Sequence, residues 1–371
     1  MLNKFFIDYL RKKMNVKPKD ALLLHLFFSD TLTQENVDTL LSGYEMDNAR
    51  LEFSLLVALL RKKHPEVQFP QSIIPRLDGI VRFFHVKNAA LLEGFNEIGK
   101  ALSERGIPIL LTKGVVMKYF RPDEPRFMSD VDFIVPEDFY EEAVQIAKDL
   151  GFSGVQEHHS TDLTKGGAFI DIHRLFLHGG EKEGAIILKN MFANAKKTSA
   201  FGVDVLIPSK EDFMLLMISN SYHNIAVQPS IHIGSYYYFF DCARLIEDNK
   251  NLDWDAIFET ASKSGNLYQI WVYLELMNQL IPAFLPEGLL AKIPIKSEDP
   301  MIEQLKNDTL FRINDELLQQ QKESKLSNCK NIPDVIFSLG VRMKRALLAV
   351  VRKIQVMRFL FLSIFFRLYK N

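Results

Sequence analysis

The stretch RFMSDVDFIVP, residues 126–136, constrains the fold more than any other part of the chain. Two aspartates, Asp130 and Asp132, stand one residue apart within an apolar run. Burying a carboxylate among apolar side chains is costly unless a partner replaces the lost hydration. Because side chains alternate along a strand, both carboxylates are expected on one face, while Val131 and Phe133 enter a core on the other. The run therefore predicts a strand with one charged face.

A second stretch, AFIDIHRLF, carries a related pattern. In a strand, Asp171 and His173 share one face, and Ile170 and Ile172 share the opposite one. If the two strands are neighbours, three carboxylates converge and raise one another's pKa. A divalent cation resolves this conflict, and Mg²⁺ is usually held by a few carboxylates together with substrate phosphates. Two such ions about 4 Å apart can clamp the attacking and leaving oxygens of a phosphoryl displacement.

The chain contains a second D-x-D sequence, which provides an internal comparison. Asp253 and Asp255 flank Trp254, but no apolar strand surrounds them and a helical pattern follows. Aspartate is a preferred residue immediately before a helix, so Asp253 is expected to be an N-cap. The apolar surroundings of Asp130 and Asp132 favour a functional role for that pair instead.

The layout of the chain predicts an α+β protein: helices, then a small strand-rich unit, then helices again. Apolar residues recur at helical spacing in the first 95 residues and again after Ser209. Between them, IPILLTKG predicts a buried strand that ends at Lys113, with Gly114 as the following turn. The predicted parts are an N-terminal helical region, an α/β core, a helical domain and a basic amphipathic tail, at residues 1–95, 96–208, 209–330 and 331–371.

Composition excludes some classes of function. The net charge of -1 gives the chain as a whole no nucleic-acid signature. The two cysteines form no C-x-x-C pair, so neither a zinc site nor a disulfide framework is expected, and a reducing compartment fits. The N-terminus lacks the apolar core of a signal peptide, and no run reaches the roughly 18 apolar residues of a membrane span. A cytoplasmic location is therefore expected.

The C-terminal tail is basic and amphipathic. From residue 339 onward there are no acids, and the basic residues lie between apolar ones at helical spacing; they are Arg342, Lys344, Arg345, Arg352, Lys353, Arg358, Arg367 and Lys370. Such a helix is typical of a membrane-surface or partner-binding element. Residues 339–371 are expected to bind the inner face of the membrane or a partner protein, or to pack on the acidic remainder of the chain.

The stretches LLTKGVVMKYF, RFMSDVDFIVP and FIDIHRLF, in this order, resemble the polymerase-beta-like nucleotidyltransferase superfamily, in particular its bacterial branch of uncharacterised or putative nucleotidyltransferases. The helical segments ISNSYHN, FDCARLIEDN and LDWDAIFETA extend the resemblance to about residue 290. It implies a small mixed-sheet nucleotidyltransferase core flanked by helical regions. It also implies transfer of a nucleoside monophosphate from an NTP donor to a hydroxyl, with Mg²⁺ or Mn²⁺ as cofactor and release of pyrophosphate.

By this resemblance, Asp130 and Asp132 bind the catalytic metal ions, and Asp171 is the third carboxylate and the general base for the acceptor hydroxyl. Further residues are expected near the nucleotide: Lys113 and Gly114 beside the triphosphate, Arg126 and Ser129 towards the phosphates, and His173 on the face of Asp171. His223 and Asp241 lie on helices predicted to cover the site, where a core or capping role is favoured.

One departure from the superfamily pattern keeps an alternative open. Better-studied members follow the first strand with Gly-Ser or Gly-Gly, which holds the triphosphate, whereas Gly114 is followed by Val115. Lys113 can substitute with a point charge. The alternative is a catalytically degenerate scaffold or partner-binding protein at the membrane surface, and a toxin-type enzyme that modifies RNA or protein is a third hypothesis.

The sequence alone does not identify the acceptor of the nucleoside monophosphate. The acidic body of the chain argues against a long nucleic acid, and a hydroxyl of a sugar, another small molecule or a protein is favoured. Chains that resemble this one occur in bacterial surface-polysaccharide settings, which is an association and not a mechanism.

Overall fold

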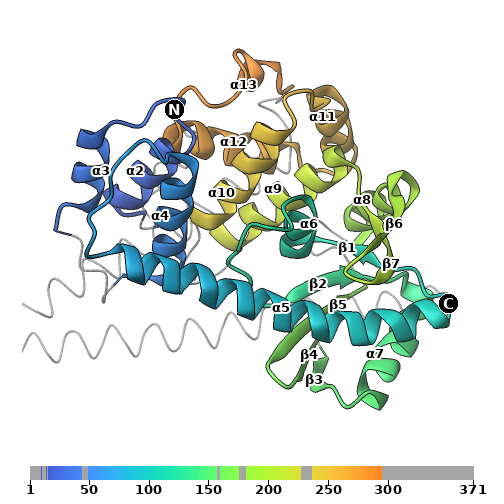
Figure 1. The fold of residues 1–371 in the computed structure, drawn as a ribbon. Helices are drawn as coiled ribbons and strands as arrows, with labels where there is room; N and C mark the ends of the chain where they lie inside the picture. The colour runs from blue at the N-terminus through green and yellow to red at the C-terminus, as the bar shows by residue number, and fades with distance from the viewer. Residues whose placement is uncertain are drawn as a thin grey trace, which may run out of the picture. The chain divides into compact units, whose positions relative to one another are not determined.

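The structure is a computed structural model that describes residues 10, 14, 16–43, 49–156, 159–174, 181–226 and 236–294 (Figure 1). The chain divides into two units, Met1–Ile302 and Glu303–Asn371, and every described residue lies in the first. The predicted tail, residues 331–371, therefore lies outside the described residues, as does the end of the predicted helical domain.

The described elements alternate between helical and strand-rich parts in the predicted order. The first helices are α2 (Pro18–Phe27), α3 (Gln34–Leu41), α4 (Leu51–Lys63) and α5 (Ile74–Glu104). The strand-rich part contains β1 (Leu110–Leu111), α6 (Lys113–Phe120), β2 (Val131–Ile134), the 3₁₀ turn η2 (Glu137–Phe139), α7 (Tyr140–Asp149), β3 (Ser153–Gln156), β4 (Ser160–Lys165), β5 (Ala168–His173), α8 (Glu181–Asn194), β6 (Lys196–Ala200) and β7 (Val203–Ile207). The last helices are α9 (Lys210–Ala226), α10 (Tyr236–Asp248), α11 (Trp254–Lys263), α12 (Leu267–Leu280) and α13 (Leu289–Lys292).

The strands form one seven-stranded mixed sheet in the order β3-β4-β5-β2-β1-β7-β6. The pairs β2–β5 and β1–β7 are parallel, and the other four neighbouring pairs, including β1–β2 in the middle of the sheet, are antiparallel. All four residues of β2 are buried, which explains its continuous apolar run around Asp132. The predicted α+β class is confirmed.

The long helix α5 joins the N-terminal helices to the sheet (Figure 1). It packs against α4 on one side, and against β5 and β7 further along. Gly94 makes the close approach to the sheet possible, because a Cβ at this position would lie 2.4 Å from Cβ of Ala168. The helix ends before Gly106, whose φ of +70° suits glycine, as the sequence pattern predicts.

The C-terminal helices cover another part of the sheet. Helix α9 packs against α10, α11 and α12, and α6 lies between β2 and α9. The predicted cap of α9 is present: the Ser209 hydroxyl accepts from the Asp212 amide at 3.0 Å and donates to its carboxylate at 2.8 Å. This arrangement brings α6 and α10 next to the strand that carries the D-x-D sequence.

Several elements were not predicted from the sequence. Strands β3 and β6 are the two edges of the sheet, and all four residues of β3 are exposed. Exposed edge strands need no apolar run, so they leave no hydrophobic pattern to detect. Helix α5 also extends across the predicted boundary at residue 95, and the domain boundaries stay predictions. None of the described helices has both the length and the hydropathy of a membrane span.

Candidate active site

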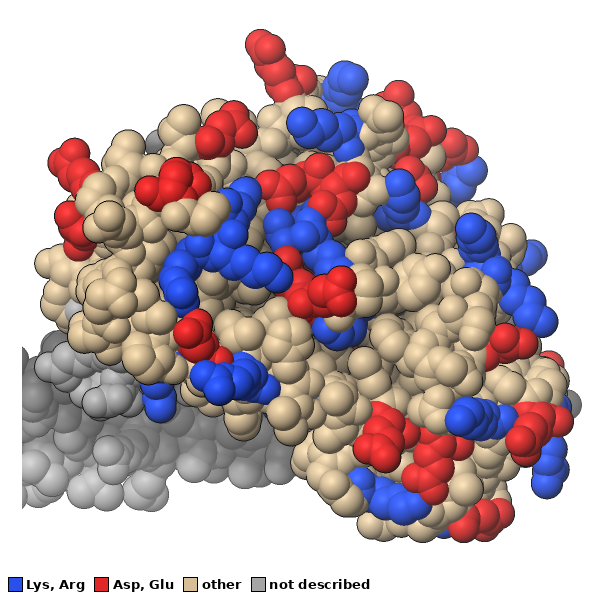
Figure 2. Space-filling model, viewed as in Figure 1, with Lys and Arg blue, Asp and Glu red and all other residues tan. Residues whose placement is uncertain are grey.

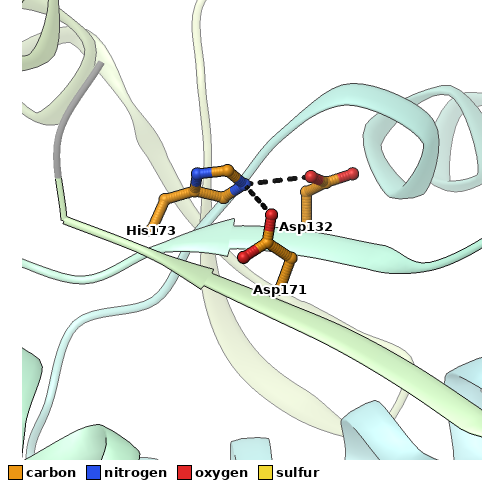
Figure 3. A group of neighbouring side chains, drawn as sticks. All are labelled: Asp132, Asp171 and His173. Carbon is orange, nitrogen blue, oxygen red and sulfur yellow. Dashed lines mark hydrogen bonds and ion pairs between the residues drawn. The ribbon is translucent and has the colours of Figure 1, made fainter. Parts of the chain in front are cut away.

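Two acids and a histidine meet where the parallel strands β2 and β5 lie side by side. The register pairs Asp132 with Asp171 and Ile134 with His173, so the two carboxylates are direct neighbours on one face. Nε2 of His173 lies 3.0 Å from Oδ1 of Asp132 and 2.8 Å from Oδ2 of Asp171 (Figure 3). We call Asp132, Asp171 and His173 the acid–histidine cluster. Strand alternation and pairing alone therefore explain how the three side chains meet.

Lys113 supplies a positive charge to this cluster. Its ammonium forms an ion pair with Oδ1 of Asp132 and lies 3.3 Å from Nε2 of His173. Lys113 follows β1 and begins α6, and its φ of +46° lies in the left-handed region. Strained backbone of this kind costs a non-glycine residue about 1–3 kcal/mol and is concentrated at functional sites. Its side chain is 29% exposed and is the most exposed of the four side chains in this group.

The cluster has the geometry of a cation site. One ligand atom from each of Asp132, Asp171 and His173 lies within 4.8 Å of the others. Oδ1 of Asp171 is buried and has no hydrogen-bond partner among the described residues. A buried carboxylate oxygen without a partner is destabilising, so this atom indicates a missing ligand. The residues present therefore fit a divalent cation such as Mg²⁺ or Mn²⁺.

The electrostatics of the cluster depend on Lys113 and His173. Burial acts to raise the pKa of Asp132, but the Lys113 ammonium and the bond from His173 outweigh it and hold this pKa well below its usual range. Burial likewise opposes ionisation of Asp171, and His173 again outweighs it and lowers the pKa. The pKa of His173 is raised, since its bonds to the two carboxylates outweigh burial and the repulsion from Lys113.

Asp130 lies just before β2 and outside the acid–histidine cluster. Its carboxylate accepts a hydrogen bond from the exposed Ser129 hydroxyl at 2.9 Å. Burial raises the pKa of Asp130 to about 6, and the negative charge of Asp132 adds to this rise. Lys113 and Ser129 act in the opposite direction. Two carboxylates two residues apart thus differ strongly in acidity, because the ammonium of Lys113 is paired with Asp132.

The structure pairs Arg126, which the sequence resemblance places towards the phosphates, with Asp241 of α10; its contact with phosphates stays a prediction. Its Nε donates to Oδ1 of Asp241 at 3.3 Å and its Nη2 pairs with Oδ2. The backbone of Arg126 is fixed as well, since the Asn88 side chain of α5 makes two hydrogen bonds of 2.9 Å to it. The arginine therefore ties the segment before β2 to helices α5 and α10.

Arg126–Asp241 is the innermost of three ion pairs between residues 121–126 and α10. Arg121 donates to Asp248 at 2.9 Å, and Glu124 accepts from Arg244 at 2.5 Å. We call these three pairs the ion-pair ladder. The exposed fraction of the acid falls from 36% for Asp248 to 23% for Glu124 and 4% for Asp241. The acids of the ladder are thus more buried the closer they lie to the strand with the D-x-D sequence.

Gly114 is explained by the same arginine. It lies in the first turn of α6, not in a separate turn, and a Cβ at this position would lie 2.3 Å from Nη1 of Arg126. Val115, which departs from the superfamily pattern, is fully buried and offers no polar group. In the structure, the glycine makes room for Arg126, and the polar group of this segment is the Lys113 ammonium.

The helix of Asp241 was predicted to cover the site, but sequence reasoning missed the pairing of Asp241 with Arg126 and the place of Tyr238. Tyr238 lies close enough for its pKa, raised first by burial, to respond to the charges of Lys113, Asp130 and Asp132. Asp241 follows three residues later, one helical turn along, which is the signal that could have marked this face of the helix. The comparison pair behaves as predicted: Asp253 caps α11 by accepting from the Ala256 amide at 3.0 Å.

The sequence profile of a family described as uncharacterised nucleotidyltransferase matches residues 50–282. No curated protein matches the chain.

Parts of the chain are also similar to solved structures. ANT(2")-Ia in complex with adenylyl-2"-tobramycin has 15% identity and a TM-score of 0.36, over 48% of this chain and 98% of that one. An antigenic nucleotidyltransferase-like protein from Paracoccidioides brasiliensis has 15% identity and a TM-score of 0.36, over 56% and 94%. The Thermotoga maritima CCA-adding enzyme complexed with tRNA has 17% identity and a TM-score of 0.26, over 50% and 46%.

The family match covers more than half of the chain and includes α5, the whole sheet and helices α9 to α12. It contains every residue of the acid–histidine cluster and of the ion-pair ladder. The resemblance noted in the sequence is thereby confirmed, and the chain belongs to the family of uncharacterised nucleotidyltransferases.

Proposed function

We propose that the protein is a metal-dependent nucleotidyltransferase that moves a nucleoside monophosphate from an NTP to a hydroxyl group, with release of pyrophosphate. One observation supports this most strongly: two neighbouring carboxylates and an imidazole converge beside a lysine, and one buried carboxylate oxygen has no partner among the described residues. Such a group is unfavourable as a structural feature of an apolar sheet. It is favourable as a site for a divalent cation and phosphates.

The cation would be held by Asp132, Asp171 and His173, with Asp130 as a further carboxylate at the edge. Carboxylates suit Mg²⁺ and Mn²⁺, and the imidazole makes Mn²⁺ at least as good a match as Mg²⁺. When bound, the cation would neutralise the phosphates and stabilise the charge that develops on the attacking and leaving oxygens. The burial of Asp132 and His173, at 5% and 8% exposed, excludes water from this side of the site.

The chain's own residues account for the remaining steps. The acceptor oxygen forms a bond to the α-phosphorus while the bond from phosphorus to the pyrophosphate oxygen breaks. The acceptor proton moves to a carboxylate oxygen of Asp171 that does not hold the cation, and then to solvent. Lys113 supplies a positive charge for the phosphates. Asp132 is the poorer proton acceptor, because the Lys113 ammonium pairs directly with it.

The acceptor that we propose is a small molecule, a sugar or a protein hydroxyl. Basic and acidic side chains are interspersed on the face of the molecule seen in Figure 2. A long nucleic acid needs a continuous basic surface, and the net charge of -1 does not favour one.

A thermal-shift series with each NTP, with and without Mg²⁺ or Mn²⁺, tests the proposal without knowledge of the acceptor. A ligand that binds only the folded state raises the melting temperature. We expect one NTP to do so only with the metal, and we expect Asp132→Asn to abolish the shift while Asp255→Asn keeps it. No shift with any NTP from well-folded protein would contradict the proposal.

Burial of Val115 favours a second candidate, a catalytically degenerate scaffold, because position 115 offers no hydroxyl to a triphosphate. The same series, followed by an assay of pyrophosphate release, separates the two candidates. The scaffold predicts no NTP-dependent shift in the presence of metal, or a shift without any pyrophosphate release. Association of residues 339–371 with a membrane or a partner belongs to this candidate too, and these residues lie outside the described part of the chain.

A further inference from the structure

The Lys113 ammonium occupies the place where a cation would bind. It pairs with Oδ1 of Asp132 and lies 3.3 Å from Nε2 of His173, and these two atoms belong to the group that could hold a metal ion. A divalent cation and an ammonium cannot share the same oxygen at close range, because the two positive charges repel. A cation that binds through Oδ1 of Asp132 therefore competes with Lys113 for that oxygen.

The structure gives Lys113 a way to leave. Its side chain is 29% exposed, whereas that of Asp132 is 7% exposed, so the lysine approaches the cluster from the solvent side. A lysine has a flexible four-carbon stem that lets a point charge change partners while the backbone stays fixed. The only other lysine in α6, Lys118, is held by the carbonyl oxygens of Pro122 at 2.5 Å and Glu124 at 2.9 Å, so it does not serve the cluster.

If a metal ion displaces the Lys113 ammonium, the ammonium needs a new anionic partner. Both carboxylates of the cluster would then be holding the metal ion, so the partner must come from outside the cluster. We propose that Lys113 is a tethered cation that holds the cluster until a triphosphate arrives, and that its ammonium moves from Asp132 to the triphosphate as the divalent cation enters. This inference rests on the proposed function and adds a coupling to it. The metal ion alone competes with Lys113 for Asp132. When triphosphate binds as well, the metal ion pairs with the carboxylates and the Lys113 ammonium pairs with the triphosphate.

The coupling has a direction that can be measured. Because free energies of binding are linked, a triphosphate that removes Lys113 from Asp132 must raise metal affinity, and the metal must raise triphosphate affinity by the same factor. Loss of the lysine charge should strengthen binding of the metal alone and weaken the coupling. A lysine with a merely structural role would produce neither change.

The test compares Mn²⁺ binding to the full chain, followed by the EPR signal of free Mn²⁺, in wild type and Lys113→Met. Methionine is unbranched and similar in length, and it keeps the same backbone cost at φ +46°. Without triphosphate, we expect Lys113→Met to bind Mn²⁺ about tenfold more tightly, the size expected for losing a competing charge-assisted bond. Lys165→Met is the matched control, because Lys165 is also paired with an acid, Glu97, but lies in β4. It should bind Mn²⁺ like wild type.

The second arm repeats the titration with inorganic triphosphate, which cannot transfer a nucleotide. We expect triphosphate to strengthen Mn²⁺ binding by wild type about tenfold more than it strengthens binding by Lys113→Met. Lys113→Gln, which keeps a hydrogen-bond donor without the charge, serves if the methionine variant does not fold. Equal or weaker Mn²⁺ binding by both variants without triphosphate would overturn the inference and leave the proposed function standing. Absence of Mn²⁺ binding in every protein, even with triphosphate, would overturn both.

Discussion

The acid–histidine cluster and the ion-pair ladder are both buried groups of charges, and they differ in how completely the charges are matched. In the innermost pair of the ladder, Arg126 and Asp241 meet through two bonds, one acid to one base. In the cluster, His173 bonds to both carboxylates and Lys113 pairs with Asp132 alone, and Oδ1 of Asp171 has no partner among the described residues. Nε of Arg244 in the ladder is also buried without a partner among the described residues, but it is a donor on a cation, whereas the open atom of the cluster is a carboxylate oxygen. The ladder is therefore suited to hold structure, and the cluster is suited to receive a cation.

The two groups are also connected. The ladder fixes residues 121–126, which lead directly to Asp130 and into β2. A closed ladder thus positions the carboxylates of the cluster without contacting a substrate. The following predictions test the division of labour between the two groups.

The largest effect is expected at the cluster. Asp132→Asn removes the charge that pairs with Lys113 and that would hold the cation, so the rate of pyrophosphate release should fall on the order of 10³-fold. The exposed Asp255, changed to asparagine, is the control and should leave the rate unchanged. The measurement is pyrophosphate release from the NTP identified by thermal shift. A rate within threefold of wild type in the Asp132→Asn variant would remove the cluster from the mechanism.

Substitutions in the ion-pair ladder should lower the free energy of unfolding. Asp241→Ala leaves Arg126 buried without its partner, which typically costs about 3–5 kcal/mol in the free energy of unfolding. The outermost pair, with Asp248 36% exposed, is screened by solvent, so Asp248→Ala should cost no more than about 1 kcal/mol. Urea unfolding of both variants measures the difference. Equal losses of unfolding free energy in the two variants would show that the burial of an ion pair does not determine its contribution to stability.

A smaller effect is expected from Asp130. Its pKa of about 6 in the folded protein exceeds the ordinary value of 3.8, so the folded state binds more protons between these two values. Stability should therefore fall as pH rises from about 4 to 6, by roughly 2 kcal/mol after allowance for partial exposure. Asp132 and Asp171 have lowered pKa values, so they change the stability below this pH range. His173 has a raised pKa and changes the stability above it.

Urea unfolding of wild type and Asp130→Asn in EDTA isolates the contribution of Asp130. The variant should show a flatter dependence on pH between 4 and 6, and a saturating divalent cation should flatten the wild-type curve in the same way. Parallel curves for the two proteins would show that Asp130 ionises normally and lies outside the field of the cluster.

The smallest effect concerns the second D-x-D sequence. Asp253→Ala removes the N-cap of α11 and should cost about 1 kcal/mol in stability. Mn²⁺ binding and pyrophosphate release should be unchanged, because this acid lies on a helix and not in the sheet. A loss of Mn²⁺ binding in this variant would show that the second D-x-D sequence is also part of a metal site, and would contradict its assignment as a helix cap.

Much of the fold could be predicted because the central elements carry their own patterns. Alternation placed Asp132, Asp171 and His173 on common faces, and it needed only β2 and β5 to be neighbours, as they are. The edge strands could not be predicted, because an exposed strand such as β3 has no buried face to impose an apolar pattern. A local pattern is informative only where local residues face the core.

The partners of Arg126 and Lys113 could not be predicted for a different reason. Arg126 meets Asp241, which is 115 positions away, and Lys113 meets Asp132 and His173 through the folding of the sheet. Such pairs depend on tertiary packing, and a single sequence contains no record of them. A basic residue near a D-x-D sequence therefore indicates charge at the site, and the structure decides which acid it meets.

The most direct test of the account is the position of a bound metal ion. Crystals grown with Mn²⁺ and inorganic triphosphate would show the ion by its anomalous scattering. The account predicts a peak within about 2.5 Å of carboxylate oxygens of both Asp132 and Asp171, with the Lys113 ammonium on the triphosphate. A structure with triphosphate bound, no peak at the acid–histidine cluster and Lys113 still paired with Asp132 would contradict it.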